Sequence, residues 1–220
     1  MIYKEALEID KRTFFQYYLS LLRTKHLLIF SFYTTKDYNS RIVKINLFIF
    51  NFALTYTVSA FFFDDSTMHK IYEDGGGFNL EYHIPKIVYS TIISCLITTI
   101  VKLIALSESN VIKIRSAKLK DLNEVYKSEI KSINRKFIIY FIINIILLLF
   151  FWYYVSCFCA VYKNTQTQLI KDTICSFVAS LIYPFIIDLI PGIFRICALK
   201  DIKKDSGYKY KFSKFIQFCI

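Results

Sequence analysis

The 220-residue chain is 55% hydrophobic and 18% aromatic, yet it contains only 5 glycines and 3 prolines. A soluble domain of this length needs more loop-forming residues and shorter apolar runs, so we exclude that class. The formal net charge is +11, but the basic residues flank the apolar runs and do not form a separate polar domain, which excludes a nucleic-acid partner and indicates contact with anionic lipid headgroups.

The first element in chain order is an aromatic stretch, residues 13–33, with Arg23, Lys25 and His26 near its centre. Charge in the middle of a membrane helix is costly, so this stretch is not predicted to cross the bilayer. We expect a helix in the cytoplasmic interface, with Arg23 and Lys25 toward the headgroups and an apolar face toward lipid. That face consists of Phe14, Tyr17, Leu21 and Leu22. The alternative is a helix packed beneath the membrane domain.

Four apolar segments have the length of about 20 residues that a helix needs to cross a hydrocarbon core about 30 Å thick. They cover residues 45–63, 87–106, 137–162 and 173–199. The sequence therefore predicts an all-α fold, a four-helix transmembrane bundle with cytoplasmic interfacial helices. We divide the chain into a cytoplasmic N-terminal segment with the interfacial helix (1–44), a four-span transmembrane domain (45–199) and a basic cytoplasmic tail (200–220).

Lysine and arginine alternate between the segments that separate these spans. Residues 1–44, 107–136 and 200–220 contain 8, 8 and 6 of them, whereas residues 64–86 and 163–172 contain 2 each. Basic loops stay in the cytoplasm, so we expect both termini and the 107–136 loop inside, and the other two loops outside or in a lumen. The sequence does not indicate which membrane the protein occupies.

The loops carry less information than the spans. In residues 107–136, opposite charges three or four apart accompany a rough helical period, which predicts a helix that extends the spans inward and is either solvated or bound to a partner. Residues 64–86 contain several acids and two histidines around Gly75-Gly76-Gly77. Their spacing matches no known ligand loop, so we expect a solvated hairpin and no metal site.

The second span carries Ser90, Ser94, Thr98 and Lys102 at intervals of four residues, which places them on one stripe of a helix that we expect to face other spans. Lys102 and Asp188 of the fourth span fall at nearly equal depth, about 23 Å in at 1.5 Å per residue. We hypothesise that Lys102 and Asp188 form an intramembrane polar pair. The alternative is that the long Lys102 side chain reaches the inner headgroups.

The fourth span is interrupted by Pro184, Asp188 and Pro191-Gly192. Proline removes a backbone donor, so we expect a kink or a short unwound turn around Asp188. Broken helices with an acid at the break bind ions in some channels and transporters. A simple bend explains the same residues.

Six cysteines are scattered through or beside the spans, in neither a disulfide framework nor a zinc spacing. Cys157 or Cys159, near the outer end of the third span, could meet Cys175 near the outer start of the fourth. We take Cys159 and Cys175 as the candidate disulfide, in a compartment that permits oxidation.

No catalytic motif, phosphate-binding glycine loop or metal cluster occurs in the sequence. We therefore predict no enzyme, no cofactor and no catalytic, cofactor-binding or metal residues. The favoured function is a multi-pass membrane anchor or interaction module, in contact with the lipid bilayer and with either a second copy through the Ser/Thr-lined second span or a protein partner on the cytoplasmic side. The alternative is an ion channel or transporter element that uses Lys102 and Asp188.

Residues 11–33, 64–82, 150–173 and 189–200, among them DDSTMHKIYEDGGGFNLEY and LIPGIFRICALK, resemble a family of uncharacterised protist membrane proteins. In that family a four-span module forms the C-terminal part of larger surface proteins. The resemblance covers most of the chain and implies a cell-surface or internal-membrane anchor, with no activity or functional residue assigned. It also implies that the chain is either a C-terminal fragment or a short paralogue that lacks the ectodomain.

Overall fold

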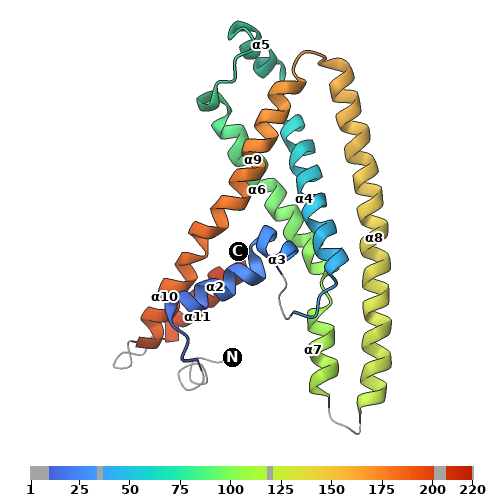
Figure 1. The fold of residues 1–220 in the computed structure, drawn as a ribbon, viewed down its shortest axis with the longest axis vertical. Coiled ribbons are helices and arrows are strands. Elements are labelled where there is room, and N and C mark those ends of the chain that lie inside the picture. Colours follow the sequence, from blue (N-terminus) through green and yellow to red (C-terminus); the bar gives the residue numbers. More distant parts are fainter. Residues whose placement is uncertain (1–9, 34–36, 118–120, 201–206, 220) are drawn as a thin grey trace. The chain divides into compact units, whose positions relative to one another are not determined.

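The computed structural model describes residues 10–33, 37–117, 121–200 and 207–219 (Figure 1). Every regular element in these ranges is an α-helix, which confirms the all-α prediction. The chain packs as two compact units, residues 36–180 (unit 2) and residues 1–35 with 181–220 (unit 1). We describe each unit separately.

Unit 2 contains long helices that pack around an apolar seam. Its elements are α4 (Arg41–Phe61), α5 (Asp65–Glu73), α6 (Leu80–Ala105), α7 (Glu108–Ser116), α8 (Leu122–Val161) and the first part of α9 (Gln166–Ile187). Leu47, Phe50 and Leu54 of α4 are buried and recur every three or four residues, the spacing that puts side chains on one face of a helix. This face makes α4 the central helix, in contact with both α6 and α8.

Within the described residues, four helical segments are long and apolar enough to cross a membrane. They are Arg41–Phe61, Leu80–Ser116, Leu122–Val161 and Gln166–Leu199, and each corresponds to one predicted span. The chain is therefore compatible with a multi-pass membrane protein. In the third segment only 17% of the most apolar window is buried inside the protein, so α8 has a long exposed apolar surface.

The two loops predicted to lie outside meet at one end of unit 2, where α5 and the α8–α9 turn are neighbours (Figure 1). The Tyr162 hydroxyl donates to Asp65 at 3.3 Å, and the Asp65 charge raises the pKa of Tyr162. The Gln168 side chain donates to the Gly76 carbonyl. Gly75 and Gly76 have φ of 60° and 80°, a left-handed turn that glycine adopts without strain and that ends α5.

Parts of two segments predicted to lie inside, residues 37–44 and 107–136, meet within unit 2. The Asn39 side chain accepts hydrogen bonds from the backbone N–H groups of Ser107 and Glu108, both at 3.1 Å, and so caps the start of α7. Lys136 donates to the Asn110 side chain at 2.8 Å, which ties α7 to α8. The bounds of α7 and α8 confirm that the described part of residues 107–136 is largely helical.

Unit 1 is built from α2 (Phe14–Lys25), α3 (Leu27–Phe32), the end of α9, α10 (Leu189–Lys200) and α11 (Gly207–Cys219). A capping box of Thr13 and Gln16 starts α2. At the α2–α3 break, the His26 ring caps α3 through Ile29 and lies 2.7 Å from the Leu181 carbonyl through Nε2. His26 is therefore a buried structural residue.

The predicted lipid-facing side of the first helix is wrong for most of its residues. Tyr17, Leu21 and Leu22 are buried inside the protein, and α2 packs on α10. Packing against α10 within unit 1 explains this burial. An apolar face fits protein as well as lipid, so periodicity alone could not decide between them.

The predicted break in the fourth span is confirmed. α9 ends at Ile187, α10 begins at Leu189, and Asp188 lies in the turn between them. The Asp188 N–H still donates to the Pro184 carbonyl at 2.9 Å, so the chain bends here without a loop. The turn places the Asp188 side chain in the interior of unit 1, where it is buried.

Candidate functional site

The polar stripe of the second span faces the interior of unit 2, as predicted. Ser90, Ser94 and Thr98 of α6 are all buried. Ser90 and Ser59 of α4 share a hydrogen bond at 3.1 Å, and the Thr98 hydroxyl donates to the Asn51 side chain of α4 at 2.7 Å. Small polar residues let the two helices approach closely, and their side chains satisfy one another across the contact.

The same region of α6 also contacts the first part of α9. The Thr91 hydroxyl donates to the Ser176 carbonyl at 3.2 Å, and the rings of Phe48 and Phe52 from α4 pack edge-on against Phe177. These three helices enclose the polar stripe within one copy of the chain. Ser90 and Ser94 are buried within a single copy of the chain, and a homo-oligomer through the second span stays a prediction.

A buried ionisable pair lies at the outer end of this interior. His83, in the first turn of α6, is 2% exposed, and Asp172 of α9 is fully buried. Nδ1 of His83 is 3.2 Å from Oδ1 of Asp172, within ion-pair distance but without hydrogen-bond alignment. The Phe78 ring stacks on His83 at 4.6 Å and the Phe63 ring lies 6.0 Å away, which keeps the pair in an apolar setting.

Other buried polar atoms lie on α9, the helix that carries Asp172. The hydroxyls of Thr173 and Ser176 and the Gln168 side-chain oxygen are buried without a hydrogen-bond partner among the described residues. Burial of a polar side chain without a polar neighbour is costly, so the close approach of the His83 ring and the Asp172 carboxyl stabilises both side chains in the interior. The described residues contain no group of three or more His, Cys, Asp or Glu that could bind a metal ion.

The residues of the predicted intramembrane pair lie in different units. Lys102 is half-buried on α6 of unit 2, at the end of the Ser/Thr stripe. Asp188 belongs to unit 1, where the Tyr18 hydroxyl donates to the Phe185 carbonyl at 2.8 Å. Burial raises the pKa of Tyr18, and the nearby Asp188 charge raises it further. The pairing of Lys102 with Asp188 stays a prediction.

Cys159 and Cys175 both lie in unit 2 and carry free, half-buried thiols in the structure. Cys157 is also free, and its side chain is exposed. The Cys159–Cys175 disulfide stays a prediction for an oxidising compartment.

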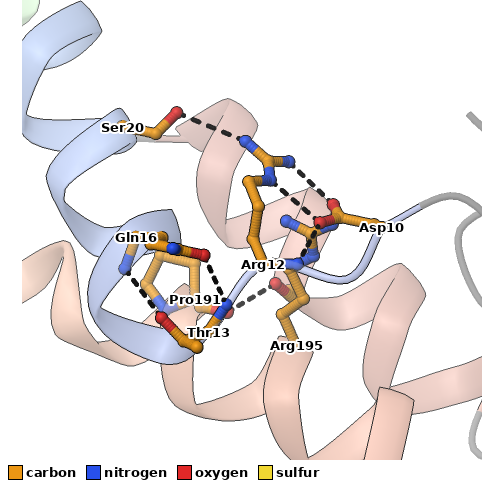
Figure 2. A network of polar contacts seen from close by, with 8 residues as sticks. Asp10, Arg12, Thr13, Gln16, Ser20, Pro191 and Arg195 are labelled. Atoms are coloured by element: carbon orange, nitrogen blue, oxygen red, sulfur yellow. Dashed lines mark hydrogen bonds and ion pairs between the residues drawn. The ribbon is translucent and has the colours of Figure 1, made fainter.

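Unit 1 contains a second polar cluster, centred on Asp10 (Figure 2). Nε of Arg12 donates to Oδ1 of Asp10 at 2.9 Å and Nη2 of Arg12 donates to Oδ2 at 2.7 Å, while the Arg195 guanidinium also pairs with Oδ2. Both guanidinium carbons lie over the Tyr17 ring, at 5.3 Å for Arg12 and 4.1 Å for Arg195. Burial raises the pKa of the Tyr17 hydroxyl, although the Arg12 charge acts in the opposite direction.

No protein-family model matches this chain. A comparison with curated proteins and one with solved structures also found no significant match.

Sequence reasoning missed both ionisable clusters. His83 was assigned to a solvated outer hairpin and Asp172 to the second outer loop, because the apolar windows begin at residues 87 and 173. The helices extend beyond those windows and bring the two side chains together inside unit 2. For the Asp10 cluster, the sequence does contain one signal. Arg195 is a charged residue within the fourth apolar segment, and a buried charge requires a partner.

Proposed function

We propose that this chain is a multi-pass membrane anchor and interaction module, with both termini on the cytoplasmic side. The strongest support for this proposal is that buried polar side chains of unit 2 form hydrogen bonds between helices. Ser59, Ser90, Asn51 and Thr98 join α4 to α6, so the polar stripe of α6 acts as a helix–helix contact. A module of this kind holds its helices together and presents the remaining surfaces to lipid and to partners.

The outer surface of α8 supports the same function. Its exposed side chains are large and apolar over most of the span: Ile138, Ile142, Ile145, Ile146, Leu149, Phe150 and Trp152. The bilayer is the occupant that this surface fits. On the cytoplasmic side of the span, Tyr126, Lys127 and Lys131 are exposed on the same helix, and they form the surface that we propose for a protein partner. The proposed relation to protist surface proteins would make the module the anchor of a larger ectodomain.

A second candidate function is an ion- or proton-conducting element. The observation that favours it is the burial of two carboxylates: Asp172 in unit 2 is fully buried, and Asp188 in unit 1 is 1% exposed. Buried acids within membrane helices are common in proton and ion pathways. Under this alternative, Asp188 and Lys102 are the first candidates for residues that take part in conduction.

One reconstitution experiment separates these functions. The native chain, Asp172→Asn, Asp188→Asn and the exposed control Glu81→Gln are placed in liposomes, and ion conductance and proton flux are measured at two pH values. Thermal unfolding of the same samples in detergent reports on folding. Because removing one partner of a buried pair costs about 3 to 5 kcal/mol, Asp172→Asn should lower the unfolding midpoint, and Glu81→Gln should leave it unchanged.

The anchor function predicts that vesicles with native protein are as tight as protein-free vesicles, and that none of the variants changes the leak. Flux through the native chain that Asp172→Asn or Asp188→Asn abolishes, with the variant still folded, would contradict the anchor and establish the conducting element.

A further inference from the structure

The Asp10 cluster lines a cavity of about 340 Å³ within unit 1. Its charged residues are three cations and one anion: Arg12, Arg195, Lys214 and Asp10. Five hydroxyl-bearing residues complete the polar lining: Tyr17, Ser20, Thr24, Tyr210 and Ser213. The volume lies at the lower end of the range of about 300 to 1,000 Å³ found for small-molecule sites. The cavity therefore has the size of a site for a small anion with a polar attachment.

The donors in this cavity are arranged around an oxyanion. Two guanidinium groups converge on Oδ2 of Asp10, and Arg12 adds a second parallel bond to Oδ1 (Figure 2). The side chains of Arg195 and Asp10 are only 7% and 4% exposed, and Nε of Arg195 is buried with no hydrogen-bond partner among the described residues. Arginine forks of this kind match phosphate as well as carboxylate.

The charges in the cavity favour a phosphate monoester over a diester. Three cationic side chains face one carboxylate, so Asp10 leaves positive charge in excess. A phosphodiester brings a single negative charge, the same as Asp10, whereas a monoester carries about 1.5 to 2 negative charges at pH 7. A monoester therefore neutralises this group of cations more completely.

The surroundings of the cavity indicate that the phosphate belongs to a lipid. Arg195 lies one helical turn before Leu199, the end of the fourth apolar segment, which puts its guanidinium at the depth of the headgroups. Large aromatic side chains are exposed on the helices that form the cavity, including Phe15 of α2 and Tyr208 and Phe215 of α11. Aromatic residues of this kind favour the boundary between headgroups and acyl chains.

We propose that this cavity binds the phosphate monoester of an anionic lipid headgroup. Asp10 is a tethered carboxylate that occupies the arginine donors until the headgroup displaces it. Arg12 and Arg195 hold the phosphate oxygens, and Lys214 adds the third positive charge. The site goes beyond the anchor function and is the same whether the module anchors or conducts.

The test is a binding titration on the full-length chain in neutral detergent. The probe is a water-soluble, short-chain phosphatidylinositol monophosphate, and the comparison ligands are short-chain phosphatidylinositol, which has only the diester, and inorganic phosphate. Loss of a charge-assisted hydrogen bond should weaken probe binding about tenfold in Arg12→Gln and in Lys214→Gln. Asp10→Asn should tighten it, because the competing carboxylate is gone. Lys211→Gln, which removes an exposed charge of α11 outside the cavity, is the matched control.

Three results would overturn the proposal. Equal weakening in Lys211→Gln and Lys214→Gln would mean nonspecific attraction to a basic surface. Weaker binding in a folded Asp10→Asn variant would mean that Asp10 builds the site and does not compete for it. Inorganic phosphate that binds as tightly as the lipid probe would overturn the lipid assignment. Because Lys214 is exposed, its variant tests the site even if Arg12→Gln fails to fold.

Discussion

At the residue scale, Asp64 shows how one carboxylate organises the outer end of unit 2. It caps α5 by accepting a hydrogen bond from the Thr67 N–H at 2.9 Å, and it lies 3.7 Å from Nζ of Lys86 at the start of the second span. The hydrogen bonds from Thr67, with smaller contributions from Ser66 and Lys86, hold the pKa of the Asp64 carboxyl well below its usual range. The charged form of Asp64 therefore stabilises α5.

This lowered pKa predicts an acid-sensitive helix. The stabilisation is fully present above the unfolded-state pKa of about 3.9 and is lost as the pH falls through the lower folded-state value. Hydrogen exchange at the Thr67 and Met68 amides, corrected for the intrinsic rate, should therefore accelerate below about pH 4. Asp64→Asn should abolish this dependence, whereas Asp74→Asn, at the other end of α5, should retain it. The explanation fails if Asp64→Asn shows the same acid acceleration as the native chain.

At the element scale, the contact between α2 and α10 in unit 1 depends on the absence of a side chain at Gly192. A Cβ atom placed there would lie 2.9 Å from Cε2 of Phe14. Glycine is a poor helix former, yet α10 carries it one turn past the Asp188 break. Close approach of the Phe14 ring is a physical reason for glycine at this position.

A bulky residue at this position should loosen α2. Gly192→Leu should displace the Phe14 ring and cost about 1 to 3 kcal/mol through overpacking, which hydrogen exchange would detect as faster exchange in residues 14–25. Ile193→Leu, at an exposed neighbouring position, is the control and should leave the exchange unchanged. Equal protection of α2 from hydrogen exchange in both variants would show that the α2–α10 contact does not depend on Gly192.

At the scale of the whole molecule, hydropathy and periodicity predicted the features that a single segment of the sequence determines. The four spans followed from apolar length, the break at Asp188 from its flanking prolines, and the buried stripe from the four-residue spacing of Ser90, Ser94 and Thr98. Side-chain contacts between two segments that are distant in the sequence could not be predicted. The pairs His83–Asp172 and Asp10–Arg195 each join residues far apart in the sequence. Likewise, the burial of Tyr17 depends on which helix covers it.

We propose that the α5 end and the α7–α8 end of the four-span module lie on opposite sides of a membrane. Glycosylation mapping tests it directly, since the native sequence has no acceptor site. Glu81→Thr turns exposed Asn79 into an acceptor at the α5 end, and Val125→Thr turns exposed Asn123 into one at the start of α8. Each variant is translated into sealed microsomes, and the glycan is read as a glycosidase-sensitive increase in mass. The proposed topology predicts a mass increase for Glu81→Thr alone. A mass increase in Val125→Thr, or no increase in either variant, would contradict it.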